Sequence, residues 1–283
     1  TIRAIEFAAN NDFVPVVSTK VSGMARNQLL ERAGQPDQLT ESEQSEYENL
    51  LKRVDSVCHV AAQKGVSIFF DAEESWMQDA IDNLVNKMMA RYNKEVIVVY
   101  NTFQMYRHDR LTYLIDSYEV AKKGGFILGA KLVRGAYMEK ERARASEKGY
   151  PSPIHPDKKG TDEAYNTALR FCVDRYEEIA ICNASHNTES NLLMAHLIEE
   201  KELPKDHPHL NFCQLLGMSD HLTFNLAASG YNVAKYVPYG EVADVVPYLI
   251  RRAQENSAVR GDMSREFELV HQEMVRRGLV ADS

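Results

Sequence analysis

Acidic and basic side chains follow the apolar runs of this sequence, where they could bind and orient a small charged molecule. Asp71 directly follows one such run, Lys20 follows another, and Lys131 lies inside a third. A carboxylate among ammonium groups in one pocket could hold an anionic substrate by charge-assisted hydrogen bonds. The residue types therefore indicate a polar pocket suited to a small anion.

A second polar group lies near the C-terminus. Tyr248, Arg251 and Arg252 stand at positions i, i+3 and i+4, which share one side of a helix. This arrangement could clamp a carboxylate with charge-assisted hydrogen bonds worth about 1.5–3 kcal/mol each. The alternative is an ordinary charged helix face.

Some of these residues also have a purely structural interpretation. Asp71 could cap the helix that follows it, and we expect Asn187 to cap its own helix. His186 precedes Asn187 at the end of an apolar run and could be a structural histidine. The residues alone leave both interpretations open for Asp71 and His186.

Seven short β-branched runs alternate with amphipathic helical stretches and would position these groups. The predicted strands are Phe13–Val17, Val66–Phe70, Val96–Tyr100, Phe126–Val133, Ile179–Asn183, Leu210–Leu216 and Val233–Val237. Their nearly continuous apolar character is typical of a parallel sheet that is covered on its outer face. In a β/α barrel the carboxyl ends of the strands share one face, so we expect the polar residues that follow them to line one pocket.

The spacing of the chain favours repeated βα units. Asp71, Asn101 and Lys131 follow one another at intervals of 30 residues, which is the length of one such unit. Repeated units build either an open doubly wound sheet or a closed barrel. No G-x-G-x-x-G turn occurs, so we favour an α/β barrel formed by residues 1–283 as a single domain. The eighth strand either precedes Thr1 or leaves no readable signal.

Local signals also mark where helices begin and end. Thr40 and Glu43 form a capping box at the start of one helix, and Gly65 lies just past its end. Another helical pattern stops at Gly124 and Gly125.

Composition excludes several classes of protein. The 283 residues are 44% hydrophobic and 26% charged, enough for one large core, and no run of about 18 apolar residues could span a membrane. A formal net charge of −8 without a basic stripe argues against nucleic acid as a partner. The four cysteines form no C-x-x-C pair, so we expect free, buried thiols. No H-E-x-x-H or comparable spacing predicts a metal site.

The polar segments resemble those of a known family. The run Lys131–Tyr137, which reads KLVRGAY, resembles the fourth-strand signature of the proline dehydrogenases. The same likeness holds, in order, for Asp71–Glu73, Ala184–Asn187, Lys235–Gly240 and Tyr248–Asn256. It extends from about Phe13 to Asn256 and is nearer to the single-function, mitochondrial-type members than to the long bifunctional bacterial ones.

The resemblance implies a fold and a reaction. Proline dehydrogenases bind FAD in a distorted (β/α)8 TIM-like barrel and oxidise L-proline to Δ1-pyrroline-5-carboxylate. They pass the electrons to a membrane quinone, with peripheral association at the membrane. A bacterial source would imply the cytoplasm and the inner membrane, and a eukaryotic source the mitochondrial matrix side. The family's first barrel strand precedes the segment that matches Phe13–Lys20, so its counterpart would lie upstream of Thr1.

The resemblance also implies roles for individual residues. The catalytic positions would be Asp71 and Lys131. The residues around proline would be Lys20, Arg251 and Arg252 at its carboxylate and Leu215, Tyr236 and Tyr248 at its ring. The residues that contact FAD would be Ala72, Asn101, Lys131, Arg134, Gly135, Ala136, Tyr137, Ser185 and His186. Many bacterial members have Arg at the position of Lys131 and Gln at that of Asn101; Lys keeps the charge of Arg but not its planar fork.

Three alternatives remain open at this point. A hydroxyproline dehydrogenase would keep the fold, although the phenol of Tyr236 should crowd a 4-hydroxyl group. A Schiff-base enzyme would use Lys20 or Lys131 as its nucleophile. A non-catalytic scaffold is disfavoured by the many ionisable groups at strand ends. The sequence also leaves open whether Asp71 orients a neighbour, such as Lys20 or a tyrosine, or removes a proton.

Overall fold

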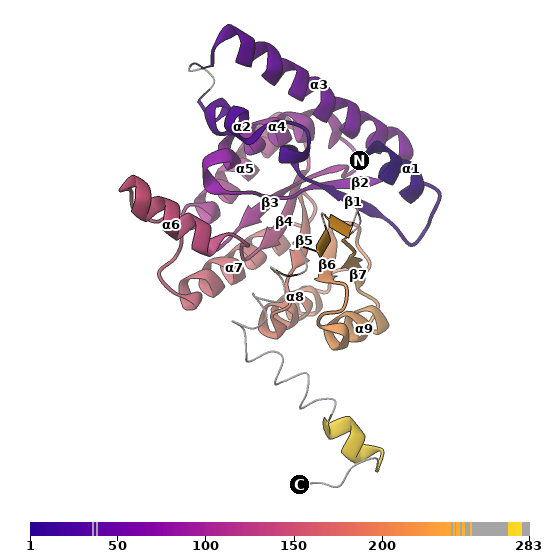
Figure 1. The fold of residues 1–283 in the computed structure, drawn as a ribbon. Helices are drawn as coiled ribbons and strands as arrows, with labels where there is room; N and C mark the ends of the chain where they lie inside the picture. Colours follow the sequence, from indigo (N-terminus) through magenta and orange to yellow (C-terminus); the bar gives the residue numbers. More distant parts are fainter. Residues whose placement is uncertain are drawn as a thin grey trace.

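The chain forms a curled sheet of seven parallel strands with helices on its outer side (Figure 1). The computed structural model describes residues 1–35, 37, 39–238, 240, 242–243, 245–246, 250 and 271–278. The strands are β1 (Val16–Thr19), β2 (Ser67–Phe70), β3 (Val99–Gln104), β4 (Leu128–Val133), β5 (Ile179–Ala184), β6 (Leu210–Leu215) and β7 (Asn232–Tyr236). They pair in chain order, and every neighbouring pair is parallel. The predicted α/β barrel class and all seven predicted strands are confirmed.

Helices connect the strands and cover the outer face of the sheet. They are α1 (Ile2–Ala8), the 3-10 helix η1 (Val21–Gly23), α2 (Asn27–Ala33), α3 (Glu41–Lys64), α4 (Ser75–Tyr92), α5 (Arg110–Gly124), α6 (Met138–Lys148), α7 (Lys158–Val173), α8 (Thr188–Glu200) and α9 (Asp220–Ala228). Within the described residues, no helix is both long and apolar enough to cross a membrane.

The helix-end signals of the sequence are confirmed. Thr40 and Glu43 form the capping box of α3, with reciprocal bonds between each side chain and the other's backbone. Gly65 and Gly125 follow α3 and α5 in the left-handed conformation, at φ of 66° and 60°. Gly adopts this conformation without a Cβ clash, so these helices end where the sequence predicts.

Alternation along each strand divides the buried residues into two layers. Side chains such as Ile68, Phe70 and Phe103 face the helices and join the large outer core. A smaller cluster inside the curl contains Phe69, Tyr100, Ala180, Cys182 and Cys213. Because strand neighbours point to opposite faces, the register decides which residues enter this interior. All four cysteines are free and buried, as predicted.

β1 and β3 begin three residues later than the sequence predicts, whereas β2 and β4 begin one and two residues later. β1 begins at Val16, and Phe13 lies outside it with 93% of its surface exposed. β3 begins at Val99, whereas the prediction started at Val96 and ended at Tyr100. The side chain of Asn93 explains the second shift, because its Oδ1 accepts hydrogen bonds from the backbone N–H groups of Val98 and Val99 at 3.1 and 2.8 Å. The N–H groups of Val98 and Val99 are therefore bonded to a side chain and not to a neighbouring strand, and β3 starts only at Val99.

β1 and β7 are the two edge strands of the described sheet, so the ring is open between them. A strand upstream of Thr1 that closes the ring stays a prediction. The parallel arrangement still brings the carboxyl ends of all seven strands to one end of the curl.

Candidate active site

Three of the predicted residues meet at the carboxyl ends of β2, β4 and β7. Lys131 Nζ donates a hydrogen bond to Asp71 Oδ1 at 2.7 Å, and the Tyr236 hydroxyl donates to Asp71 Oδ2 at 3.0 Å. Lys131 Nζ also lies 5.2 and 5.1 Å from the ring centres of Phe69 and Tyr236. Aromatic faces attract a cation, so the interior holds the ammonium from three sides.

Lys20 completes this cluster from the end of β1. Its Nζ lies 3.8 Å from Asp71 Oδ2 and 3.5 Å from the hydroxyl of Tyr137. The Lys20 side chain is 36% exposed, whereas that of Lys131 is 6% exposed. Lys131 therefore neutralises Asp71 closely, and the ammonium of Lys20 keeps donors for another anion.

The charges of the cluster stabilise one another. Burial opposes ionisation of Asp71, but the neighbouring Lys131 and Lys20 hold its pKa below the ordinary value of a carboxyl group. Burial likewise opposes the charge on Lys131, yet Asp71 holds the pKa of this lysine above its ordinary value. Both groups are thus ionised near neutral pH. This arrangement excludes the capping interpretation of Asp71, because its carboxylate oxygens face the lysines and Tyr236.

The start of α4 has a different partner. Glu74 occupies the N-cap position without a side-chain cap bond. The buried carboxylate of Glu141 in α6 instead accepts hydrogen bonds from the backbone N–H and the hydroxyl of Ser75, both at 2.6 Å. A carboxylate at a helix N-terminus is stabilised by the unpaired N–H groups and the helix dipole.

The segment after β4 provides an unusual backbone surface. Gly135 has a φ of 142°, and a Cβ at this position would lie 2.4 Å from the ring of Tyr106. Only Gly fits this conformation and this close contact. Gly135 is exposed, and Ala136 and Tyr137 are half-buried. The backbone is therefore accessible to a large flat molecule.

Arg134 and Ser185, both predicted to contact a cofactor, contact each other. Arg134 Nη1 donates to Ser185 Oγ at 2.7 Å, and its Nε donates to Asp162 at 2.8 Å. His186 follows Ser185, and its Nδ1 lies 3.1 Å from the hydroxyl of Ser219. Asn187 caps α8 as predicted, since its Oδ1 accepts from the backbone N–H of Ser190 at 2.9 Å.

Two further predicted residues lie at this end of the curl. Ala72 is buried directly after Asp71. Leu215 is the register partner of Tyr236 and lies with it on the inner face. The structure thus places predicted residues from six strands, β1, β2, β4, β5, β6 and β7, at this end of the curl, although the first and last of them are more than two hundred positions apart.

The chain matches the family model described as Proline dehydrogenase over residues 2–265. The chain belongs to the proline dehydrogenase family.

Two relatives and one solved structure illustrate this membership. "Proline dehydrogenase 1, mitochondrial" of Homo sapiens is 40% identical over 242 residues, which are 84% of this chain and 40% of the human protein. "Hydroxyproline dehydrogenase" of Xenopus laevis is 37% identical over 243 residues, 84% of this chain and 52% of that protein. The crystal structure of proline utilization A from Bdellovibrio bacteriovorus, inactivated by N-propargylglycine, has the same fold. Its TM-score is 0.79 at 22% identity, over 90% of this chain and 27% of that chain. The chain thus spans about half or less of these relatives.

The structure does not bring Asn101 to this site, although the family resemblance predicted it there. Asn101 points outward from β3, where its Nδ2 donates to the buried Asp82 of α4 at 2.8 Å. The reason is that β3 continues to Gln104, whereas the prediction ended it at Tyr100, so Asn101 lies inside the strand and not just past its end. Thr102 is the register partner of Lys131, so Thr102 and Gln104 share the inner face with it. Gln104 is the inward amide that the prediction missed; the run Thr102–Gln104 was the signal, but the misplaced strand end concealed it.

The predicted clamp of Tyr248, Arg251 and Arg252 lies outside the described residues. In the described part of the chain, no group of three or more His, Cys, Asp or Glu side chains could hold a metal ion.

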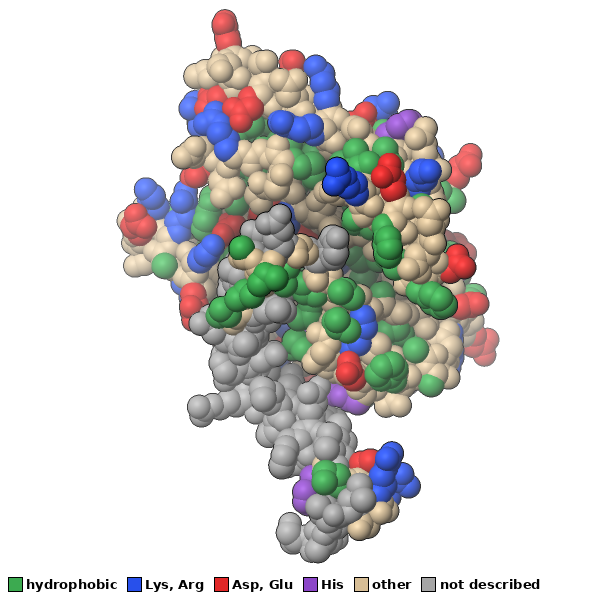
Figure 2. Space-filling model, turned by 45° about the vertical axis from the view of Figure 1, so that its right-hand side comes forward, with side chains coloured by type: hydrophobic (Ala, Val, Ile, Leu, Met, Phe, Trp, Pro, Cys, Tyr) green, Lys and Arg blue, Asp and Glu red, His purple; other side chains and the backbone are tan. Residues whose placement is uncertain are grey.

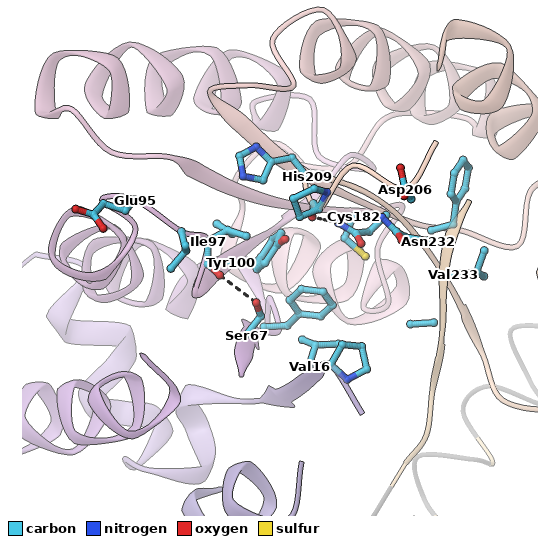
Figure 3. A pocket seen from close by; sticks show the side chains of 17 residues that line it. Val16, Ser67, Glu95, Ile97, Tyr100, Cys182, Asp206, His209, Asn232 and Val233 are labelled. Atoms are coloured by element: carbon cyan, nitrogen blue, oxygen red, sulfur yellow. Dashed lines mark hydrogen bonds between the residues drawn. The ribbon is translucent and has the colours of Figure 1, made fainter. Parts of the chain in front are cut away.

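A cavity of about 580 Å³ lies at the opposite end of the strands (Figure 3). Its lining includes Val16 and Ser67, the first residues of β1 and β2, together with Ile97 just before β3. The hydroxyl of Ser67 is already bonded to the carbonyl oxygen of Ile97 at 3.1 Å, as the dashed line shows. None of the predicted site residues that the structure describes lines this cavity. The described residues that the resemblance assigns to substrate and cofactor therefore lie away from this cavity, near the carboxyl ends of the strands.

Proposed function

We propose that this chain catalyses the FAD-dependent oxidation of L-proline to Δ1-pyrroline-5-carboxylate, as one proline dehydrogenase-like domain of residues 1–283. The observation that carries the proposal is the cluster of Lys20, Asp71, Lys131 and Tyr236 at the strand ends of a chain in this family. In this cluster Lys20 and Lys131 both face Asp71, and the partly exposed Lys20 ammonium is placed to bind the carboxylate of a small substrate such as proline.

Lys20 would bind the carboxylate of proline. Its Nζ is 3.8 Å from Asp71, beyond hydrogen-bond distance, and its side chain is partly exposed. A carboxylate that approaches Lys20 would meet a cation whose donors are only loosely engaged. Arg251 and Arg252 would complete this binding site.

Tyr236 and Leu215 would contact the proline ring. They are register partners on the inner face, next to the charged cluster. The bond from the Tyr236 hydroxyl to Asp71 fixes the phenol ring in place. A fixed ring limits the size of substituent that can enter.

Asp71 would orient its neighbours rather than remove a proton. Its pKa is lowered by Lys131 and Lys20 despite its burial, so it is a weak base near neutral pH. Its two oxygens hold Lys131 and Tyr236 in fixed positions. This supports a catalytic role for Asp71 through orientation and charge.

The residues after β4 and β5 fit a flat cofactor. The exposed backbone at Gly135 would lie against it. FAD, when bound, accepts the hydride from the ring carbon next to the proline nitrogen. The protein residues that would hold it are Ala72, Lys131, Arg134, Gly135, Ala136, Tyr137, Ser185 and His186.

The first test is a spectroscopic one. We expect the purified holoprotein to be yellow and to lose its flavin absorbance when L-proline is added without oxygen. The product should have the mass of Δ1-pyrroline-5-carboxylate. A colourless protein that forms a borohydride-stable adduct with a carbonyl compound would instead indicate Schiff-base chemistry. The raised pKa of Lys131 argues against that chemistry, which needs a neutral amine.

A 4-hydroxyproline dehydrogenase is the second candidate, because one of the relatives bears that name. Tyr236 favours proline, since its fixed phenol should crowd a 4-hydroxyl group. We expect kcat/KM for trans-4-hydroxyproline to be far below that for proline. Tyr236→Ser should reduce the preference for proline, measured as the ratio of the two kcat/KM values. Tyr236→Phe keeps the bulk of the ring and should keep the preference. Equal use of both substrates by the wild-type protein would exclude the proline preference.

A membrane quinone is the proposed electron acceptor, with peripheral membrane association. Figure 2 shows a face on which hydrophobic side chains gather across the middle, while many charged side chains lie toward its rim. Leu216 and Val237, which follow β6 and β7 at the site end of the curl, are 55% and 58% exposed. We expect Leu216→Ser/Val237→Ser to weaken binding to anionic lipid vesicles. Phe13→Ser, at the opposite strand end, is the control. If the double variant and Phe13→Ser bind the vesicles equally well, Leu216 and Val237 do not form the membrane-binding surface. In a bacterium the protein would associate with the inner membrane, and in a eukaryote with the membrane on the mitochondrial matrix side.

A further inference from the structure

Glu73 joins the two loops that carry Lys20 and Asp71. It is 4% exposed and lies two residues after Asp71. Its Oε1 accepts a hydrogen bond from the backbone N–H of Ser22 at 3.0 Å, and its Oε2 accepts from the Ser22 hydroxyl. Ser22 lies in η1, two residues after Lys20. One carboxylate thus spans 51 positions of sequence.

The backbone of Glu73 is also held on both sides. Its N–H donates to Gln78 Oε1 at 2.8 Å, and its carbonyl oxygen accepts from Gln104 Nε2 at 2.7 Å. Gln78 Nε2 donates in turn to Asp82, which forms an ion pair with Arg110 at 2.8 Å. These side chains are buried, so the hydrogen bonds are shielded from water. The loop after β2 is therefore anchored to β3, α4 and α5.

The strand ladder alone does not set the distance between Lys20 and Asp71. The register of β1 and β2 ends with the pair Thr19 and Phe70. Beyond it, the backbone N–H of Asp71 donates to Thr19 at 2.9 Å, and the side chain of Glu73 holds η1. The position of the Lys20 ammonium depends on η1, because this short turn follows Lys20 directly.

We propose that Glu73 is a positioning residue, which fixes Lys20 against Asp71 for binding of the substrate carboxylate. This rests on the proposed function. Both carboxylate oxygens of Glu73 are engaged by Ser22, so Glu73 acts through Lys20 and does not touch substrate. Its loss should weaken carboxylate binding more than the chemical step.

The test compares Glu73→Ala with Glu73→Gln in the holoenzyme. Gln has the same length and can accept from the Ser22 N–H and donate to the Ser22 hydroxyl, so it keeps both bonds without the charge. For Glu73→Ala we expect KM for proline to rise by about tenfold while kcat falls less than about threefold. Glu73→Gln should restore KM to within about twofold of the wild-type value.

Glu74→Ala is the matched control. Glu74 is the next residue along the chain, but its carboxylate pairs with Lys140 of α6 at 2.9 Å and not with Ser22. This variant should leave KM for proline unchanged. An equal rise of KM in both variants would show a general effect of charge on the loop and would overturn the proposal.

Inhibition by cyclopentanecarboxylate separates this proposal from the proposed function. This compound has the ring and the carboxylate but no nitrogen beside an oxidisable carbon. Its inhibition constant should rise by about tenfold in Glu73→Ala, in parallel with KM. A wild-type protein that does not oxidise proline would refute the proposed function. An active wild type with the same KM and inhibition constant as Glu73→Ala would refute the positioning role alone.

Ser22→Ala provides a milder variant in case Glu73→Ala does not fold. It removes the hydroxyl donor and keeps the backbone N–H bond. We expect KM to rise by about threefold, with flavin absorbance and kcat close to the wild type. A normal KM in Ser22→Ala together with a raised KM in Glu73→Gln would contradict the proposal, because charge and not the hydrogen-bonded link would then matter.

Discussion

Asp71→Asn should destabilise the protein much more than Lys131→Met, because the two changes leave different charges behind. Asp71 faces Lys131 at 2.7 Å and Lys20 at 3.8 Å. Asp71→Asn leaves the buried Lys131 without this carboxylate, and the loss of one partner from a buried pair costs about 3–5 kcal/mol. Lys131→Met leaves Asp71 with Lys20 and the Tyr236 hydroxyl. The loss of one hydrogen-bond partner by a buried acceptor lowers the free energy of unfolding by about 1–3 kcal/mol.

The double variant tests whether this is one interaction. Asp71→Asn/Lys131→Met removes both charges and fills the site with side chains of similar size. It should be more stable than Asp71→Asn alone and show a coupling energy of about 2–3 kcal/mol. The assay is urea unfolding of the flavin-loaded protein at pH 7, followed by flavin and tryptophan fluorescence. Asp174→Asn, in the exposed pair with Lys201, is the control and should cost at most about 1 kcal/mol. Additive single effects would refute the reasoning.

The pH dependence of stability gives an independent check on the same pair. The pKa of Asp71 is lowered in the folded state, so its stabilisation is present above the unfolded value of about 4 and is lost as the pH falls through the folded value. The pKa of Lys131 is raised, so its stabilisation is present below the unfolded value of about 10.4 and is lost as the pH rises through the folded value. The difference in free energy of unfolding between the wild type and the double variant should therefore shrink as the pH falls into the acid range. If this difference in free energy of unfolding stays unchanged down to the lowest pH at which both proteins fold, the stabilising role of the Asp71–Lys131 pair is contradicted.

Three other perturbations have defined outcomes. Arg252→Met should raise KM for proline strongly while flavin stays bound, and a normal KM would remove Arg252 from the clamp. Gly135→Ala should weaken flavin retention and destabilise the protein by about 1–3 kcal/mol, because φ is 142° and the added Cβ would meet the Tyr106 ring; unchanged flavin content after gel filtration would contradict this. Thr40→Ala removes the acceptor for the Glu43 N–H and should lower the free energy of unfolding by about 1 kcal/mol. A decrease in the free energy of unfolding smaller than a few tenths of a kcal/mol would show that the capping box contributes little.

The sequence by itself determined the number and order of the strands and many of the helix ends. These depend on neighbours along the chain: an apolar run between polar segments makes a buried strand, and Thr40, Gly65 and Gly125 act within one turn of their own helices. The ends of the strands also placed Asp71 and Lys131 at one face, because parallel strands share a direction.

Only the tertiary structure decided which face each β3 residue occupies. All six residues of Val99–Gln104 are buried, since the sheet is covered on both sides, and the period of two is therefore hidden. β3 begins at Val99, after the bonds to Asn93, and continues to Gln104, so Asn101 lies inside the strand and faces Asp82 while Gln104 faces inward. The link between Ser22 and Glu73 is likewise invisible in the sequence, because the contact of two loops 51 positions apart depends on how β1 and β2 pair in space.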